Sequence, residues 1–398
     1  MKAEESAPVF PLKRPDPYTP PPEYRPKDGA ELRRCPLAYG GEAWLVTGMQ
    51  SARGILADSK SFSSDTARPG FPAFPLASKR PIPGHFLSMD PPEHTRLRRL
   101  VADEFTAGRV KRTRPAIAAT VAGLVDGLGA RDGSADVVAD VALPLPAITA
   151  SQMLGTPLED REFFVECVRR MQRHDASYAQ RAAAAGRLNQ YLARLITAKR
   201  RKPGANVLGR LARALDEGQV DLDEAVGVAN LIVVAGLETT AGLLSLTVLS
   251  LLEHPDQADL VRTDPGRWAG PTVGEALRYW TVVQHGVARV ATRDFELGGC
   301  RIVEGDAVVV SLPSVNRDPT VYPDPDRFDI TRDVQGQLAF GHGVHRCLGS
   351  FVAHAQAELA VAELFSRLPG LRAAVTSTDL SFLDDMLIYG LRALPVAW

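Results

Sequence analysis

A long apolar stretch between residues 225 and 252 constrains the fold more than any other part of the chain. Asp221 precedes it in the manner of a helix N-cap, with Glu224 three residues later, and Pro255 follows its end. Apolar residues occupy almost every face, which is typical of a helix that is buried all round. About 30 residues would extend for roughly 45 Å, the width of a whole domain. The other elements are therefore expected to pack around this helix.

A membrane span is the competing interpretation of this stretch. Asn230, Glu238, Thr239 and Thr240 interrupt it, and it holds no run of about 18 uncharged apolar residues. The chain shows no apolar signal core near its start, where residues 1–25 form an extended, proline-rich lead-in. We therefore expect a soluble, cytoplasmic protein without a membrane anchor.

The composition is that of an ordinary globular protein. Hydrophobic residues make up 45% and the net charge is −1, which provides for a large core and gives no indication of nucleic-acid binding. No linker, charge block or repeat divides residues 1–398, so we expect a single domain. The four cysteines lie far apart and indicate neither a zinc site nor a disulfide framework.

The stretch from Phe340 to Gly349 concentrates glycines, histidines and one cysteine just before an amphipathic helical pattern. Cys347 is expected near a helix N-terminus, where the dipole and free N–H groups favour its thiolate, a strong ligand for iron. Gly341 and Gly343 permit the close backbone approach that a flat macrocycle requires. A glycine-rich loop with a buried, inert cysteine is the alternative.

This stretch resembles the haem-binding loop of the cytochrome P450 family, in which Phe, Gly, Cys and Gly stand at fixed spacings. Phe340, Gly343, Cys347 and Gly349 occupy those positions. The resemblance extends to the C-terminus and implies the cytochrome P450 fold, mainly α with a small β region. It also implies haem b (iron protoporphyrin IX) as the cofactor, with Cys347 as the iron ligand and Phe340, Gly341 and Gly349 among its contacts.

Four further residues match haem-binding positions of the family. His94 and Arg98 lie four residues apart, so they share one helical face and suit a carboxylate. The matching helix of the family holds a haem propionate with this pair. Arg289, in an alternating segment, and His345 match the residues at the other propionate. A solvated basic helix face is the alternative for His94 and Arg98.

The middle of the long helix, from Ala235 to Thr240, resembles the oxygen-activation motif of the family. The resemblance implies that Ala235 makes room over the iron and that Glu238 and Thr239 relay protons to bound oxygen. A buried glutamate is costly without a partner or a task. The alternative is Glu238 paired with a core arginine, with Thr239 bonding back to a helix carbonyl.

Glu275 and Arg278 match the Glu-x-x-Arg motif of the family, with Arg327 as the downstream arginine. The resemblance gives these three residues a structural role, as a buried charge network that braces the cysteine loop. The remaining pattern predicts a strand and short helix over 42–57, several helices over 111–200, and strands over 281–312 that include a hairpin-like pair at 301–312.

Apolar residues of four segments are the predicted substrate contacts. Residues 66–86 hold five prolines and no periodicity, which is typical of a lid or binding loop, and the family has a mobile pocket wall there. The predicted contacts come from this loop, the long helix, the segment after Arg278 and a C-terminal turn: Phe71, Phe74, Phe86, Val234, Val282, Val283, Gln284, Met386, Leu387 and Ile388.

These resemblances predict a bacterial monooxygenase that oxidises, by default hydroxylates, a sizeable lipophilic molecule. The segment Arg68 to Phe71 resembles actinobacterial members that tailor polyketides and other secondary metabolites or oxidise foreign compounds. Ring closure and coupling use the same chemistry and stay open. A peroxide-driven enzyme and a non-catalytic haem-thiolate sensor or carrier are the other classes, and Glu238 with Thr239 argues against both.

The chain carries no flavin or dinucleotide-binding fingerprint, so its electrons have to come from another protein. We expect NAD(P)H to supply them through a separate reductase and a ferredoxin. Arg99 and Arg346 are the predicted contacts for an acidic ferredoxin. His354 follows Ala353 where many relatives carry arginine, which changes the surface offered to that partner. We expect the protein to be a monomer.

Overall fold

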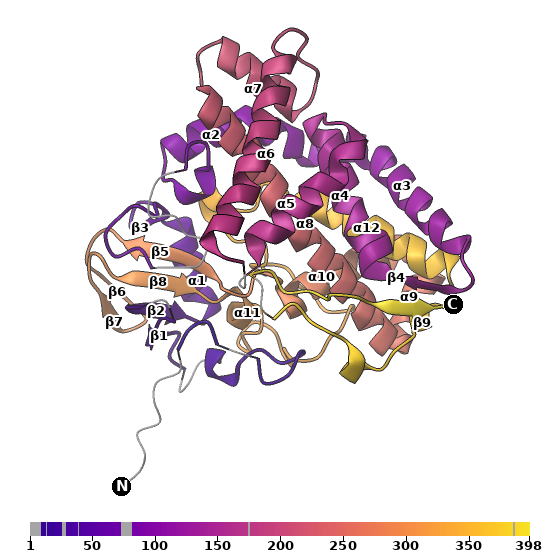
Figure 1. The fold of residues 1–398 in the computed structure, drawn as a ribbon. Helices are drawn as coiled ribbons and strands as arrows, with labels where there is room; N and C mark the ends of the chain where they lie inside the picture. Colours follow the sequence, from indigo (N-terminus) through magenta and orange to yellow (C-terminus); the bar gives the residue numbers. More distant parts are fainter. Residues whose placement is uncertain are drawn as a thin grey trace.

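Helices fill most of the molecule, and a β region lies at one side (Figure 1). The computed structural model describes residues 9–12, 14–25, 29–38, 40–72, 82–173, 176–384 and 387–398. The helices are α1 (Met49–Ala57), α2 (Glu93–Ala102), α3 (Ala107–Gly129), α4 (Pro144–Leu154), α5 (Arg161–Gln172), α6 (Tyr178–Lys199), α7 (Val207–Asp216), α8 (Leu222–Glu253), α9 (Pro255–Thr263), α10 (Pro265–Trp280), α11 (Leu312–Val315) and α12 (Ser350–Arg367). The predicted mainly α fold with a small β region is confirmed.

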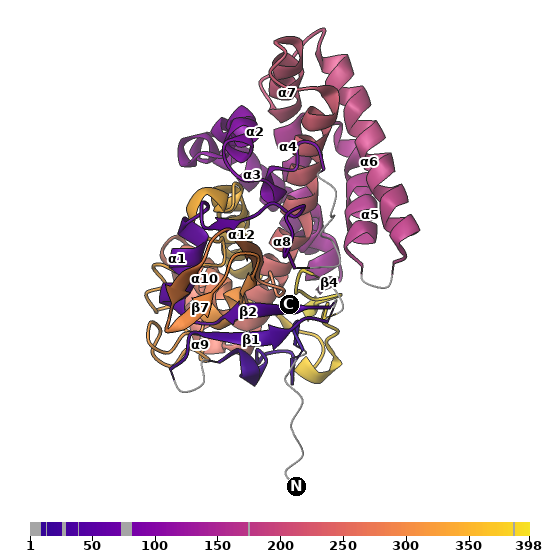
Figure 2. The same cartoon turned by 90° about the vertical axis from the view of Figure 1, so that its left-hand side faces the viewer.

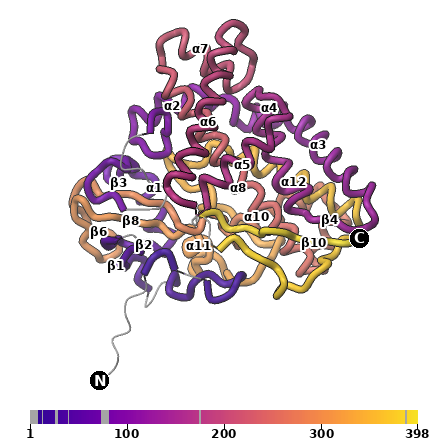
Figure 3. Tube along the Cα trace, viewed as in Figure 1, coloured from indigo at the N-terminus to yellow at the C-terminus, as the bar shows by residue number. Residues whose placement is uncertain are grey.

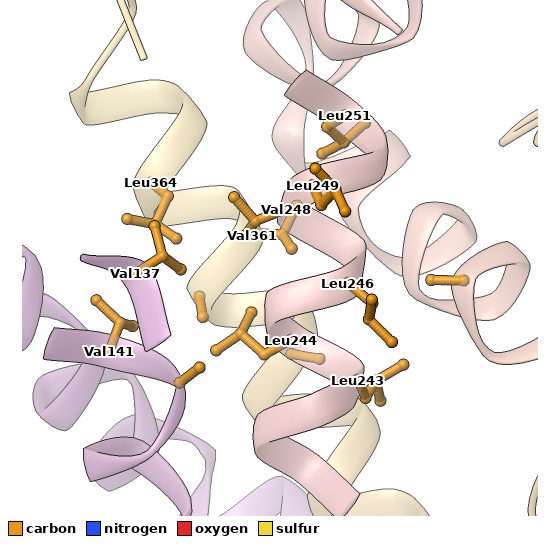
Figure 4. Packing of buried hydrophobic residues seen from close by; sticks show 14 of the residues in the cluster. Val137, Val141, Leu243, Leu244, Leu246, Val248, Leu249, Leu251, Val361 and Leu364 are labelled. Carbon is orange, nitrogen blue, oxygen red and sulfur yellow. The ribbon is translucent and has the colours of Figure 1, made fainter. Parts of the chain in front are cut away.

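Helix α8 is the long helix that the sequence predicts. The Asp221 carboxylate accepts a hydrogen bond from the Glu224 N–H, and the Glu224 carboxylate accepts one from the Asp221 N–H, so the predicted N-cap is confirmed. By length and composition α8 would cross a membrane, but most of its apolar window is buried inside the molecule. Leu244 and Val248 pack there against Val361 of α12 (Figure 4).

The strands form three sheets. They are β1 (Leu32–Pro36), β2 (Glu42–Val46), β3 (Phe62–Ser63), β4 (Ser134–Asp136), β5 (Val287–Ala291), β6 (Phe295–Leu297), β7 (Cys300–Ile302), β8 (Ala307–Val310), β9 (Arg372–Ala373) and β10 (Pro395–Ala397). The orders are β1-β2-β8-β5-β3, β4-β10-β9 and β6-β7. The hairpin-like pair predicted over 301–312 is wrong, because β7 pairs with β6 while β8 lies between β2 and β5.

Helices α5 and α6 lie beside α8, on the side away from the five-stranded sheet (Figure 2). Helix α5 ends at Gln172 and α6 begins at Tyr178. Near the end of α5, Arg169 contacts Glu238 and Gln172 contacts Val234, so its last turn lies over the middle of α8, where the predicted proton relay is located.

Both ends of the described chain meet at the segment that follows α10. The Arg14 guanidinium donates to the Gln284 side-chain oxygen at 2.7 Å, and the Tyr389 hydroxyl donates to the Pro17 carbonyl at 2.7 Å. An isolated β-bridge pairs Val283 with Ile388. The described segment around Pro17 and the last segment of the chain accordingly run close together in Figure 3. Within residues 9–12 and 14–25, the lead-in has one short 3₁₀ turn at Pro22–Tyr24, and the side chains of Phe10 and Tyr24 are buried.

Candidate active site

The loop before α12 has a conformation that requires glycine. Gly341 and Gly343 have φ values of +68° and +71°, in the left-handed region. A Cβ atom on Gly343 would lie 2.2 Å from the carbonyl oxygen of Leu56, at the end of α1. The Cys347 N–H donates to the Phe340 carbonyl at 2.8 Å and closes the loop. The loop is thus a fixed turn that presents the cysteine just before a helix.

The Cys347 side chain lies at the end of this loop, just before α12. It keeps exposed surface, while burial raises the pKa of its thiol. The Gly349 N–H and the guanidinium groups of Arg98 and Arg346 act against that rise. Cys347 precedes the first turn of α12. Its thiolate would therefore be stabilised by one backbone N–H and two guanidinium cations, and less by the free N–H groups and dipole of the helix N-terminus. Coordination to a metal ion deprotonates such a thiol.

His94, His345, Arg98 and Arg289 come together beside this loop, as predicted. The rings of His94 and His345 lie 4.2 Å apart, and burial lowers the pKa of both. Arg98 donates to the Arg346 carbonyl at 2.6 Å. Burial also lowers the pKa of Arg289 to about 10, and its guanidinium donates a hydrogen bond to the backbone carbonyl of Ala288.

The Nε2 atoms of His94 and His345 are buried and have no hydrogen-bond partner among the described residues. Buried polar atoms are rarely left unpaired, so this pair indicates a missing polar group. Arg98 and Arg289 flank them, and neither forms an ion pair with a carboxylate of the described residues. A cluster of unpaired imidazole nitrogens and guanidinium groups would suit the carboxylate groups of a haem. The residues present therefore fit the cofactor that the resemblance implies.

The centre of α8 is open at one residue. Ala235 is exposed although most of its helix is buried, so the contacts of its neighbours leave this position of α8 uncovered. The Thr239 hydroxyl donates to the Ala235 carbonyl at 2.6 Å. Glu238 is 4% exposed, and its carboxylate lies 3.3 Å from Nε of Arg169 on α5. Burial raises the pKa of Glu238, and the Arg169 cation opposes that rise. These two contacts are the ones that the alternative interpretation of the motif expects.

The charge network behind the loop has a different third member from the one predicted. Glu275 and Arg278 are fully buried and joined by two hydrogen bonds of 2.7 Å. Arg332 is the second arginine, with its Nε 3.5 Å from the Glu275 carboxylate. The assignment of Arg327 is wrong, because its side chain is exposed and only its backbone carbonyl accepts from Arg278.

The predicted substrate contacts are distributed unevenly. Val283 and Ile388 form the β-bridge mentioned above, and partly buried Leu387 adjoins it. Phe86 is 5% exposed and its ring lies 6.0 Å from that of His94, so it belongs to the core.

Phe71 is partly exposed, while Phe74 and Met386 lie outside the described residues. The side chain of Gln284 is bound to Arg14 and to backbone carbonyls, so the prediction that it lines the pocket is not supported.

Two residues of α5 that the sequence reasoning missed contact the centre of α8. Arg169 binds Glu238, and Gln172, one turn later on the same face, donates to the Val234 carbonyl at 3.1 Å. Arginine and glutamine are common in amphipathic helices, so composition and periodicity give no signal for either contact. Only the way in which α5 lies on α8 brings them there.

Comparisons with known proteins agree over almost the whole chain. A family model described as cytochrome P450 matches residues 271–369. Cytochrome P450-SU2 of Streptomyces griseolus is 40% identical over 386 residues, which covers 96% of this chain and 94% of that protein.

Two solved structures are similar throughout. CYP105P1 in complex with filipin I has a TM-score of 0.90 and 38% identity, covering 98% of this chain and 99% of that one. The mycinamicin VIII C21 methyl hydroxylase MycCI of Micromonospora griseorubida, bound to mycinamicin VIII, has a TM-score of 0.89 and 33% identity, covering 98% and 100%.

Proposed function

The chain belongs to the cytochrome P450 family and is a haem-dependent monooxygenase, and we propose that it hydroxylates a sizeable lipophilic molecule of the secondary-metabolite class. The cluster beside the cysteine loop carries the assignment of the cofactor site. His94 and His345 offer unused ring nitrogens, and Arg98 and Arg289 offer positive charge, so the four together suit two propionates.

The Cys347 sulfur is the proposed iron ligand. Haem b held in this way supplies the activation of O₂. Phe340 accepts the Cys347 N–H through its carbonyl, and the Gly349 N–H faces the sulfur, so both fix the direction of the ligand. Gly341 has a positive φ, which favours glycine, and no protein atom lies near the position that a Cβ would take, so this side of the loop is uncovered by protein.

Glu238 and Thr239 are the proposed proton-handling residues. Burial raises the pKa of Glu238, so its carboxyl holds a proton to higher pH than an exposed glutamate would. The Thr239 hydroxyl donates its hydrogen bond to the Ala235 carbonyl. The lone pairs of its oxygen therefore remain available to accept a hydrogen bond from another group. An acceptor and an acid on successive residues can therefore pass a proton toward the open space at Ala235.

The substrate class rests on the relatives and on the pocket walls. The named relatives are bound to filipin I and mycinamicin VIII, and the walls near the site include Val234, Val283 and Leu387. We therefore favour a polyketide or another secondary metabolite. Oxidation of a foreign compound, or ring closure or coupling, remains the second candidate because the same oxidant serves each reaction.

The electron supply is proposed to be NAD(P)H through a ferredoxin reductase and a ferredoxin. Arg99 and Arg346 are exposed, and neither forms an ion pair within the described part of the chain. Arg99 lines a groove of about 940 Å³ between α2 and α7, together with Arg213. An acidic ferredoxin fits such a surface. We also propose one domain over residues 1–398, a monomeric state and a cytoplasmic location.

The absorption spectrum of the dithionite-reduced protein with carbon monoxide tests the assignment. We expect a strongly red-shifted Soret band that is lost in Cys347→Ala, and a low-spin to high-spin change when a fitting substrate binds. A spectrum like that of a histidine-ligated haem protein, or an unchanged band in Cys347→Ala, would refute the proposed ligand.

A further inference from the structure

Gln172, the last residue of α5, has a buried acceptor that no described protein group uses. Its side chain is 4% exposed. The Nε2 group donates to the Val234 carbonyl of α8 at 3.1 Å. The Oε1 atom is buried and has no hydrogen-bond partner among the described residues. One half of the amide is therefore paired and the other half is not.

The hydrogen bond to Val234 fixes which atom is left over. A carbonyl oxygen accepts but cannot donate, so a reversed amide would place two acceptors together. Donation from Nε2 thus keeps Oε1 turned away from the Val234 carbonyl. Leaving a buried acceptor unpaired costs free energy, and native proteins seldom retain such a group without a use for it.

The Gln172 amide lies against the centre of α8. It binds the carbonyl of Val234, and the next residue, Ala235, is the exposed residue of the α8 centre. Arg169, one turn earlier on α5, reaches Glu238 on the same stretch of α8. The last turn of α5 therefore faces the part of α8 at which oxidation is proposed to occur.

We propose that Gln172 is a specificity-determining residue whose side-chain oxygen accepts a hydrogen bond from a hydroxyl or N–H group of the substrate. The inference rests on the proposed function and narrows its substrate class to lipophilic molecules that carry such a donor. No described donor competes for the oxygen, so a ligand donor gains a partner there. A ligand without one leaves the acceptor unpaired and is rejected.

Ligand pairs that differ by one hydroxyl group test the proposal. The probes are hydroxylated and unsubstituted phenylimidazoles, which bind haem iron directly, and hydroxyl and keto steroid pairs, all titrated by absorption spectroscopy. In at least one pair we expect wild type to bind the hydroxylated member about tenfold more tightly, and Gln172→Leu to lose that preference. Gln172→Met, with a longer apolar side chain, replaces the leucine variant if that variant does not fold.

Gln356 provides the matched control. It is also 4% exposed with an unpaired Oε1, but it lies on α12. Gln356→Leu is expected to keep the hydroxyl preference of wild type. An equal preference in Gln172→Leu and wild type, a loss in Gln356→Leu as well, or no hydroxyl preference in wild type for any pair would overturn the inference. The carbon monoxide spectrum reports separately on the proposed function, because it does not depend on Gln172.

Discussion

Replacing Arg169 with glutamine is expected to raise the pKa of Glu238 and to move the pH range in which the enzyme works. The Arg169 Nε lies 3.3 Å from the Glu238 carboxylate, and among the described residues Arg169 is the cation that acts on that group. Coulomb's law at this separation gives about 1 kcal/mol in bulk water and about 5 kcal/mol at the effective dielectric constant of a protein surface. Because the Arg169 side chain is 37% exposed, the lower figure applies, which corresponds to about one pH unit.

The direction follows from the form of Glu238 that donates the proton. Its pKa in the folded protein is already raised by burial, and removal of the cation raises it further. The carboxyl is then protonated up to higher pH, so the alkaline decline in coupling of NAD(P)H oxidation to product moves upward by about one unit. Folding stability depends on pH in the same direction. The contribution of Glu238 to the free energy of unfolding is present in full below the pKa of an unfolded glutamate, and it is lost as pH rises through the raised pKa of the folded state.

The assay measures product formed per NAD(P)H consumed as a function of pH, together with thermal unfolding at each pH. Arg170→Gln is the matched control, because Arg170 is the next residue on α5, is exposed and forms no ion pair with Glu238 among the described residues. An unchanged alkaline limb in Arg169→Gln, or an equal displacement in Arg170→Gln, would show that the 3.3 Å contact does not control Glu238.

Three further predictions concern the proposed proton relay at Thr239, the cysteine loop and the buried charge network around Glu275. Thr239→Ala should keep haem and substrate binding but consume NAD(P)H largely without product, and tightly coupled turnover would contradict the relay role. Gly343→Ala should prevent haem incorporation, because of the positive φ and the backbone contact, whereas Gly54→Ala, at an exposed position of α1 with open space and no positive φ, should leave haem content unchanged in the same assay. Arg332→Ala should lower the free energy of unfolding in urea by roughly 3 kcal/mol, because it removes one partner of a buried carboxylate, while exposed Arg327→Ala should change it by less than about 0.5 kcal/mol; equal effects would contradict the network described above.

The parts of the fold that local physics determines could be predicted from the sequence. The start of α8 follows from Asp221 and Glu224, which cap each other within four residues. The hairpin expected over 301–312 was wrong because β8 pairs in parallel with β2, more than 250 residues earlier, and no local pattern encodes that partner.

In the candidate site, too, features that local sequence determines could be predicted, whereas contacts with distant segments could not. Gly341 and Gly343 indicate the conformation of the cysteine loop from the sequence, because glycine is favoured where φ is positive or where another backbone segment lies close. Arg327 and Arg332 look alike in sequence, and only the path of the turn decides which guanidinium reaches Glu275. Arg169 and Gln172 were missed because their partners belong to another helix.

The contacts of Gln284 have a consequence for the order in which the protein matures during synthesis. Arg14 near the beginning of the chain binds this segment, and the Val283–Ile388 bridge and the Tyr389–Pro17 hydrogen bond add residues near its end. A nascent chain that has not yet reached Tyr389 lacks the last of these contacts, although its earlier helices can already pack. The wall of the pocket near Val283 is therefore completed only after residues 388 and 389 have been added, so a fully formed pocket is a late event in biogenesis.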